Sequence, residues 1–435
     1  MTSLLRSLAG GLVFALILAG MTASSATSSG GAASALGQYI VVLKPGADRA
    51  AEIANARSLD GDVLMQYKHA LNGFAARLPA AALRAIERRA NILFVSVDGE
   101  LRATACDPSA AQCLPTGVDR IEGDRSSTKA GDGRGSVGVN VAVIDTGIAT
   151  HPDLNVVGGI DCQSGKGFDD PAGHGTHVAG TIGELTNNSV GVAGMAFNVR
   201  IMPVKVIDSL WDDILGSPFQ GTDDVVARGV RYAVDNGAKV LNMSIGRSGP
   251  PSPLLQEALV YATSHGAFVA IAAGNDFEQG NPTEWPAAYA NSIQGVVAVG
   301  AIGRDRQRSF FSTTGPYVEL AAPGGNQRVG GTTGGILQQT YDFNFTDTFA
   351  FGPLRYGPPR FDVFAYQFFQ GTSMATPHVS GFAALLMQQG ITTPAAVEAA
   401  MEQFATDLGP TGKDDQYGYG LINPRASLRG LGLAQ

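Results

Sequence analysis

Short apolar runs alternate with amphipathic or alanine-rich stretches along most of the chain after residue 138. The run from Val139 to Asp145 is continuous and rich in β-branched residues, which is typical of a strand buried on both faces of a parallel sheet. Further strands are predicted at 201–206, 240–245, 268–273 and 295–301, with helices at 222–236 and 254–265. This alternation indicates an α/β fold, a doubly wound parallel sheet with helices on both faces.

Residues 38–98 show a different and more compact pattern. Four short β-rich runs and two alanine-rich stretches follow one another in the order β-α-β-β-α-β. The strands are predicted at 39–43, 63–67, 73–78 and 92–97, and the helices at 47–59 and 80–89. This order is the split βαβ arrangement, so a small ferredoxin-like α+β domain is expected ahead of the large one.

The first 26 residues have the layout of a secretory signal peptide. Arg6 precedes an apolar run from Leu8 to Ala19, which is shorter than the roughly 20 residues that a membrane anchor needs. Export to an extracellular or periplasmic location is predicted, with no membrane association afterwards. The predicted division is a signal peptide at 1–26, a small domain at 37–105 and a large domain at 106–435.

The large domain is acidic. From Cys106 to Gln435 the chain has 20 Lys/Arg against 31 Asp/Glu, whereas Gly37 to Ala105 has 9 against 7. This balance argues against nucleic acid as a partner, because phosphate contacts need clustered Lys and Arg. The opposite signs favour an association between the two segments.

Three cysteines, Cys106, Cys113 and Cys162, are too few for a scaffold built on disulfides. Export permits one pair to oxidise, and each of the three pairings leaves one thiol over. Cys106 with Cys113 is the local choice.

The stretch Gly371-Thr-Ser-Met-Ala-Thr-Pro-His-Val-Ser-Gly381 leads into a helix of small residues. Pro377 is expected in its first turn, where proline is tolerated because those N–H groups have no partner within the helix. Ser373 is therefore expected at the helix N-terminus, beside unpaired donors and the positive end of the helix dipole. This setting suits a nucleophile whose reaction creates an oxyanion, although serine is also a favoured helix cap.

Two further polar residues lie where a strand ends and a helix begins. Asp145 ends the first strand of the large domain, and ligand or catalytic groups of open α/β sheets collect at such ends. His174 precedes a helix rich in alanine and glycine. A turn cap is the alternative for Asp145. Metal binding together with His177 is the alternative for His174, but the H-E-x-x-H spacing is absent.

Four motifs together resemble the subtilisin-like serine proteases (subtilases, peptidase family S8). They are VAVIDTGI around Asp145, GHGTHVAGTIG from Gly173, AAGN ending at Asn275 and GTSMATPHVSG around Ser373. In the small domain, YIVVLK, HALNGFAARLP and FVSVDGE resemble the inhibitory propeptide of the same family.

The resemblance implies a secreted serine endopeptidase of broad specificity that acts as a monomer on proteins and peptides. It implies that the enzyme is made as a zymogen. Residues 37–105 would assist folding and act as an intramolecular inhibitor, with their tail, 99–105, in the active site until self-cleavage.

Asp145, His174 and Ser373 follow one another in the chain order of the subtilisin catalytic triad. His174 is expected to take the Ser373 proton and pass it to the leaving amine, while Asp145 orients the imidazole. Asn275 and the N–H of Ser373 are expected to form the oxyanion hole.

The resemblance also assigns substrate-binding residues. One wall is a strand edge that pairs with an extended substrate, and the other belongs to the S1 pocket. The strand edge is formed by Ser244, Ile245 and Gly246. The wall of the S1 pocket is formed by Ala272, Ala273 and Gly274. Glu284 aligns with the floor of the pocket, where a carboxylate would favour Arg or Lys at P1; a solvated loop glutamate is the preferred interpretation.

No cofactor is expected for catalysis, but structural calcium is expected, since subtilases often bind it through loop carboxylates. The candidates by residue type are Asp169-Asp170, Asp212-Asp213 and Asp223-Asp224. No fixed ligand spacing is present, so no ligand is assigned.

Residues 338–370 form a longer segment than the family has here, and 11 of the 33 aromatic residues lie between Tyr341 and Phe369. Extra β-structure with its own small core is the favoured interpretation, and a substrate-subsite wall is the alternative.

Two other functions remain to be compared with a protease. A secreted, catalytically silent binding protein with this fold would be expected to lack a triad or oxyanion residue, and here all four are present. A serine esterase would be expected to carry G-x-S-x-G, whereas the sequence around Ser373 is GTSMA.

Overall fold

The computed structural model describes residues 37–67, 72–97, 114–121, 137–207 except 164, 166 and 187, 221–342 and 362–433. The chain divides into two compact units, residues 1–102 and 103–435. The predicted signal peptide, the tail at 99–105, Cys106 and Cys113 all lie outside the described residues.

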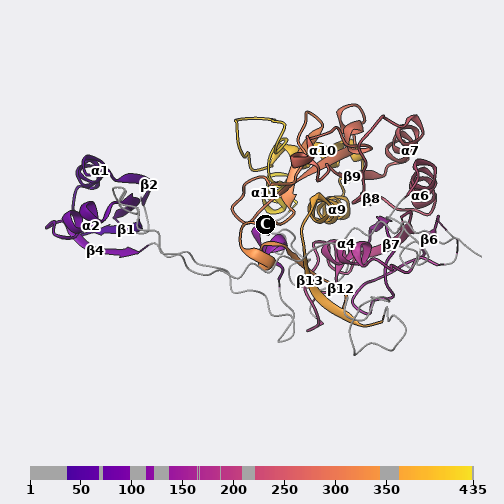
Figure 1. The fold of residues 1–435 in the computed structure, drawn as a ribbon, viewed down its shortest axis with the longest axis horizontal. Coiled ribbons are helices and arrows are strands. Elements are labelled where there is room, and N and C mark those ends of the chain that lie inside the picture. The colour runs from indigo at the N-terminus through magenta and orange to yellow at the C-terminus, as the bar shows by residue number, and fades with distance from the viewer. Residues whose placement is uncertain are drawn as a thin grey trace, which may run out of the picture. The chain divides into compact units, whose positions relative to one another are not determined.

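The first unit has the predicted β-α-β-β-α-β order (Figure 1). Its elements are β1 (Gly37–Leu43), α1 (Arg49–Ser58), β2 (Asp62–Tyr67), β3 (Gly73–Leu78), α2 (Ala80–Glu87) and β4 (Ile92–Val97). The sheet order is β2-β3-β1-β4, and β1 pairs antiparallel with both neighbours. Val41, Phe74 and Leu78 form the centre of the core, while edge strands β2 and β4 expose Met65 and Phe94.

The second unit is organised around seven strands in the order β11-β10-β9-β8-β5-β7-β6. They are β5 (Asn140–Asp145), β6 (Ile160–Asp161), β7 (Arg200–Lys205), β8 (Val240–Met243), β9 (Phe268–Ala272), β10 (Val296–Ile302) and β11 (Val318–Pro323). Every pairing in this sheet is parallel. The carboxyl ends of the strands therefore share one edge, as predicted.

Helices cover both faces of the sheet (Figure 1). The helices are α3 (Thr116–Arg120), α4 (His174–Gly183), α6 (Asp223–Asp235), α7 (Pro253–Ser264), α9 (Thr372–Gln388), α10 (Pro394–Gln403) and α11 (Pro424–Gly430). Along β5, Val141 and Val143 face the core under α4, α9 and α10, whereas Ala142 and Ile144 face the core under α6 and α7. This alternation explains why the strand is apolar at every position.

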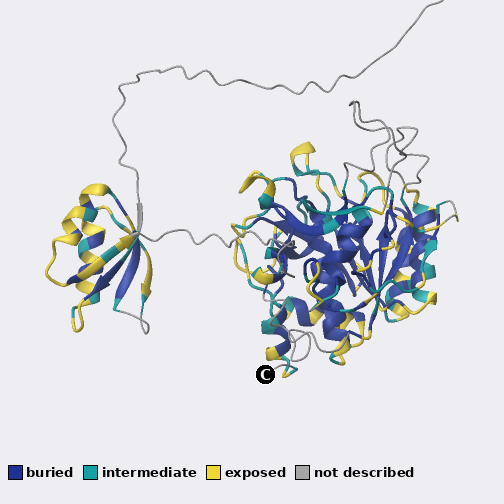
Figure 2. Ribbon diagram, turned by 90° about the horizontal axis from the view of Figure 1, so that it is seen from below, coloured by how far each residue is buried: buried dark blue, intermediate teal, exposed yellow. Residues whose placement is uncertain are grey.

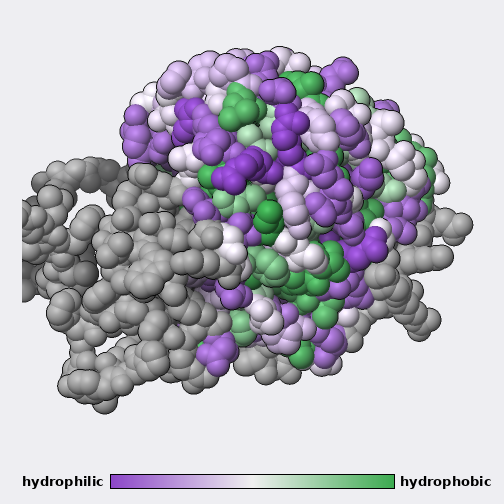
Figure 3. Space-filling view, turned by 90° about the vertical axis from the view of Figure 1, so that its right-hand side faces the viewer, coloured by the Kyte–Doolittle hydropathy of each residue, from purple (hydrophilic) through white to green (hydrophobic). Residues whose placement is uncertain are grey.

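Burial follows this layering (Figure 2): buried residues concentrate in the strands and in the inner helices. On the face seen in Figure 3, apolar residues form small groups between polar ones. No helix in the described part of the chain is long and apolar enough to cross a membrane.

A hairpin of β12 (Ile336–Tyr341) and β13 (Phe364–Phe369) precedes α9. The Phe369 ring stacks on His177 of α4 at 4.3 Å, and the Thr340 hydroxyl donates to the Gly173 carbonyl at 2.6 Å. The expected extra β-structure is present. Phe369 packs against the main core. Residues 343–361 lie outside the described part of the chain, so a small core of this segment's own stays a prediction.

Candidate active site

Asp145 is the last residue of β5 and is fully buried. Its Oδ1 atom lies 2.6 Å from His174 Nδ1 and also accepts hydrogen bonds from the Thr146 N–H and hydroxyl, at 2.8 and 3.2 Å. The second oxygen, Oδ2, is buried and has no hydrogen-bond partner. The carboxylate is thus held in place by its neighbour and aimed at the imidazole.

His174 is the first residue of α4 and follows Gly173, whose φ of 75° is left-handed. Close approach of this helix to the turn after β5 depends on Gly175, since a Cβ there would lie 2.1 Å from the Gly147 carbonyl. Burial lowers the pKa of His174, but the charge and hydrogen bond of Asp145 outweigh it, and the pKa is raised above its usual value. The imidazole is therefore a stronger base than an isolated histidine.

A buried aspartate, Asp170, joins the turn after β5 to the start of α4. Its oxygens accept from the Thr146 hydroxyl at 2.8 Å, from the N–H groups of Ala172, Gly173 and Thr176 at 3.0, 2.8 and 2.8 Å, and from the Thr176 hydroxyl at 2.7 Å. One carboxylate thus caps α4 and holds the residue after Asp145. It was a calcium candidate from sequence, but both of its oxygens are occupied by protein donors.

Ser373 lies in the first turn of α9, which begins at Thr372. Pro377 lies inside the helix, so its expected place in the first turn is wrong. Because Pro377 has no N–H, the Ser373 carbonyl lacks its usual partner four residues on, and it accepts instead from the Ser244 hydroxyl at 2.8 Å. The Ser373 hydroxyl donates to the Ser244 carbonyl at 3.1 Å.

Asn275 follows β9 and lies beside the start of α9. Its Oδ1 accepts from the N–H and the hydroxyl of Thr372, at 2.9 and 3.1 Å. These bonds determine the orientation of the amide and leave its NH₂ group available. Gly371, at φ 156° and ψ 162°, is in a region reserved for glycine, and a Cβ there would lie 3.7 Å from Asn275 Nδ2 and 3.6 Å from Ser373 N.

The sheet brings these residues to one edge. Asp145 ends β5, Ser244 follows the adjacent β8, and Asn275 follows the next strand, β9. Helices α4 and α9, whose first turns hold His174 and Ser373, pack against each other. This arrangement offers a base, an orienting carboxylate, a hydroxyl and free N–H donors.

The two predicted substrate walls flank Glu284. A Cβ on Gly274 would lie 2.3 Å from Glu284 Cγ, and one on Gly246 would lie 3.7 Å from Glu284 Oε2. Glu284 is only 3% exposed, and its Oε1 has no hydrogen-bond partner. Burial, reinforced by the nearby Asp276, raises its pKa to about 7. The preferred interpretation as a solvated loop residue is therefore wrong.

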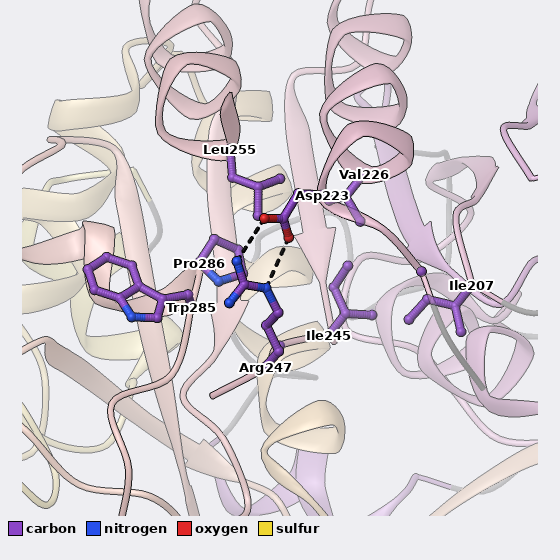
Figure 4. Close-up of a pocket in the computed structure, with 10 residues that line it drawn as sticks. Ile207, Asp223, Val226, Ile245, Arg247, Leu255, Trp285 and Pro286 are labelled. Atoms are coloured by element: carbon purple, nitrogen blue, oxygen red, sulfur yellow. Dashed lines mark hydrogen bonds and ion pairs between the residues drawn. The ribbon is translucent and has the colours of Figure 1, made fainter. Parts of the chain in front are cut away.

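A cavity of about 330 Å³, which the sequence did not predict, lies on the outer side of the 244–246 segment (Figure 4). Its apolar lining includes Ile207, Val226, Ile245, Leu255, Trp285 and Pro286. Across it, Arg247 donates to both carboxylate oxygens of Asp223, at 3.0 and 2.7 Å. The ion pair occupies Asp223, so this calcium candidate already has a cationic partner.

Of the remaining candidates, Asp212-Asp213 lies outside the described residues. Cys162 is a buried free thiol. Cys106 and Cys113 lie outside the described residues, so their pairing stays a prediction.

Comparison with known proteins agrees with this geometry. Residues 136–420 match the subtilase family and residues 38–104 match peptidase inhibitor I9. Subtilisin Savinase of Lederbergia lenta is 37% identical over 321 residues, 73% of this chain and 100% of that protein. Subtilisin E of Bacillus subtilis (strain 168) is 33% identical over 431 residues, 96% of each.

A solved structure described as proteases from Pseudoalteromonas arctica PAMC 21717 has a TM-score of 0.57 and 30% identity, and it covers 70% of this chain and 93% of that one. The chain belongs to the subtilase family. It is a subtilisin-like serine endopeptidase with an N-terminal propeptide of the I9 type.

Proposed function

We propose that Asp145, His174 and Ser373 carry out the peptide hydrolysis. The observation that carries this is the 2.6 Å contact between His174 Nδ1 and the buried Asp145 carboxylate at the end of β5. A neutral serine hydroxyl is a poor nucleophile without a positioned base, and this contact orients one.

The reaction begins when the Ser373 hydroxyl turns from the Ser244 carbonyl toward His174 Nε2. Nε2 takes the proton as the serine oxygen bonds to the scissile carbonyl carbon, and Asp145 offsets the charge of the imidazolium. The Asn275 NH₂ group and the Ser373 N–H donate to the oxyanion. His174 then protonates the leaving amine, and water releases the acyl group by the same steps in reverse order.

A sulfonyl fluoride tests the nucleophile directly. The expected result is one adduct at Ser373 and loss of casein digestion. Ser380, on the same helix with its hydroxyl bonded to Asn242, should stay unmodified. If the reagent leaves Ser373 unmodified and casein is never digested, the silent-binder alternative replaces this function.

The chain is proposed to be secreted as a zymogen and to act as a monomer. Residues 1–26 are the proposed signal peptide, 37–105 the inhibitory propeptide and 106–435 the catalytic domain. The match of residues 38–104 to an inhibitor family supports this division. The exposed side chains of Met65 and Phe94 give the propeptide sheet apolar surface without a partner in its own unit.

Extended substrates are proposed to pair with the edge at Ser244, Ile245 and Gly246, opposite Ala272, Ala273 and Gly274, with Glu284 at the pocket floor. Main-chain pairing makes the specificity broad. Among the described residues the buried Glu284 carboxylate forms no ion pair, and we expect it to add a preference for Arg or Lys at P1.

The P1 preference makes a pH-dependent prediction. The pKa of Glu284 is about 7, so its charged form, which attracts a basic side chain, grows as the pH rises through 7. The ratio of kcat/KM for P1-Arg over P1-Leu peptides should rise between pH 6 and pH 8. Glu284→Gln should lower that ratio about 10- to 100-fold, the equivalent of one charged hydrogen bond.

The matched control is Glu278→Gln, which removes an exposed glutamate that pairs with Arg328. It should leave the ratio unchanged. Equal ratios in wild type and Glu284→Gln at pH 8 would contradict the P1 assignment.

Structural calcium is proposed at the segment after α4. Asp153 and Glu184 are almost fully buried, and within the described part of the chain no hydrogen-bond partner reaches Asp153 Oδ2 or either Glu184 carboxylate oxygen. A Cβ on Gly191 would come within 2.7 Å of an oxygen of each residue, so the two carboxylates converge. Asn188 also contacts Asp153. Orphaned, converging oxygens fit a hard cation, which would neutralise the pair.

Chelation tests this proposal. The test uses Ser373→Ala protein, which is expected not to digest itself. Its free energy of unfolding should be about 3 kcal/mol lower with a chelator than with free calcium at about 100 times the Kd. Glu184→Gln should lose most of this response, while Glu257→Gln, at a 70% exposed side chain, should keep it. A full response in Glu184→Gln would exclude this pair as ligands.

Asp170 is proposed to position His174, and its replacement separates charge from packing. Asp170→Asn should lower kcat about 100-fold, the cost of a small misplacement of the base. The Asp170 charge helps to raise the pKa of His174, so the acid limb of the kcat/KM profile should move to lower pH. Thr176→Val removes a donor but no charge and should leave the limb in place. If Asp170→Asn lowers kcat but leaves the acid limb of the kcat/KM profile at the same pH, Asp170 only caps α4 and its charge does not act on His174.

A further inference from the structure

Three glutamates that belong to none of the catalytic motifs meet between β11 and α10. Glu319 comes from β11, and Glu398 and Glu402 lie four residues apart on α10. One carboxylate oxygen from each lies within 4.8 Å of the others. Positions four apart share one face of a helix, so α10 presents both of its carboxylates to the strand.

These carboxylates are more buried than surface acids. Glu319 is 5% exposed and Glu398 9%. Glu319 Oε2 is buried and has no hydrogen-bond partner among the residues that the structure describes. Glu398 Oε2 accepts from the Gly295 N–H at 2.5 Å, which leaves its other oxygen for the cluster.

Positive charge near the cluster is insufficient. Among the ion pairs of the described residues, Glu319 has one cationic neighbour, Lys413, whose Nζ lies 4.0 Å from Glu319 Oε1. If the three glutamates are ionised, the single ammonium group of Lys413 balances only one of their charges. Two negative charges then remain in a largely buried cluster. Either bound protons or a bound cation must compensate.

We propose that Glu319, Glu398 and Glu402 bind a divalent cation of the calcium class. All the side-chain donors are carboxylate oxygens, without nitrogen or sulfur, which selects a hard cation. The buried Glu319 carboxylate lies within 4.8 Å of the other two and has an oxygen without a hydrogen-bond partner among the described residues, which a set of surface acids would lack. The half-exposed Glu402 leaves an entry path and room for water ligands.

The ion would tie α10 to the edge strand β11. It shares no residue with the Asp153–Glu184 pair, so the two sites can be separated by mutation. Its effect is on stability and not on the reaction, since none of the three glutamates touches the catalytic residues.

Calcium titration of full-length Ser373→Ala protein tests the site. The Ser373→Ala parent, which keeps all three glutamates, should bind one more calcium ion per molecule than the same protein with Glu319→Gln or Glu402→Gln. A Glu184→Gln variant of the parent should retain that ion. Asp415→Asn removes an exposed charge from the neighbouring loop and should keep the full stoichiometry. Glu402→Gln, at the half-exposed position, preserves the test if Glu319→Gln does not fold.

Terbium locates the ion independently. The charges of Glu402, Glu319 and Glu398 all act on Tyr419, so its phenol lies near the cluster. Tyr419→Phe should remove part of the tyrosine-sensitised terbium emission, and calcium should displace the rest of that component in wild type. If the Gln variants bind as much calcium as the parent protein, and Tyr419→Phe leaves the emission unchanged, the cluster shares protons and holds no metal.

Discussion

Ser373→Ala protein is expected to keep its propeptide and to lose about 10⁶-fold in kcat. The Ser373 hydroxyl is the only proposed nucleophile in the mechanism, and an alanine there leaves His174 with no proton to take. Intact mass and N-terminal sequencing provide the measurement. Wild type should begin near Cys106, whereas the variant should begin near residue 27.

Ser380→Ala is the matched control for this change. Ser380 lies on the same helix, and its hydroxyl bonds to the buried Asn242 at 2.8 Å. The variant should lose about 1 kcal/mol of stability through that bond but should still remove its propeptide. A Ser373→Ala protein that processes itself would refute both the nucleophile and the zymogen proposal.

Periodicity predicted most of the second unit because its strands are buried on both faces. The strands now called β5, β7, β8, β9 and β10 were all expected, within one or two residues for most ends. Strand β6 has two residues, too few for a pattern. Strand β11 was not predicted, because an edge strand joined by tertiary pairing carries no distinct local signal.

The site was predicted where motifs carry it and missed where tertiary packing creates it. Asp145, His174, Asn275 and Ser373 were proposed from their type and order. The structure shows His174 in contact with Asp145 and Asn275 bonded to the start of α9, and the catalytic roles stay predictions. Asp170 was seen only as an acidic residue, since its donors come from two segments that meet in three dimensions. A local reading also favoured a solvated Glu284, because its burial depends on Gly246 and Gly274, which lie far away in the chain.

The position of Pro377 differs from the prediction, and this difference explains a hydrogen bond between Ser244 and Ser373. Sequence rules placed it in the first helical turn, where it costs nothing. It lies further in, and the carbonyl that it leaves unpaired belongs to Ser373. The Ser244 hydroxyl satisfies that carbonyl, so the substrate-binding edge and the start of α9 are joined by a bond that the proline makes necessary.

Asp145→Asn is expected to lower kcat about 10⁴-fold while the protein stays folded. Asp145 Oδ1 accepts from His174 and from Thr146. An asparagine keeps those bonds only by burying its NH₂ group without an acceptor at the Oδ2 position. If the amide turns over, the NH₂ group faces Nδ1 and forces the imidazole proton onto Nε2, where it blocks transfer from Ser373.

In either orientation the negative charge is gone, so the imidazolium formed during attack loses its main stabilisation. That charge raises the pKa of His174, and its removal should shift the acid limb of the remaining activity to lower pH. Asp170→Asn is the matched comparison, because it removes a second buried carboxylate that does not contact the imidazole. The loss in Asp145→Asn should exceed that in Asp170→Asn about 100-fold. Equal losses would mean that both aspartates act by holding the turn and α4 together, and that contact with His174 gives Asp145 no separate role.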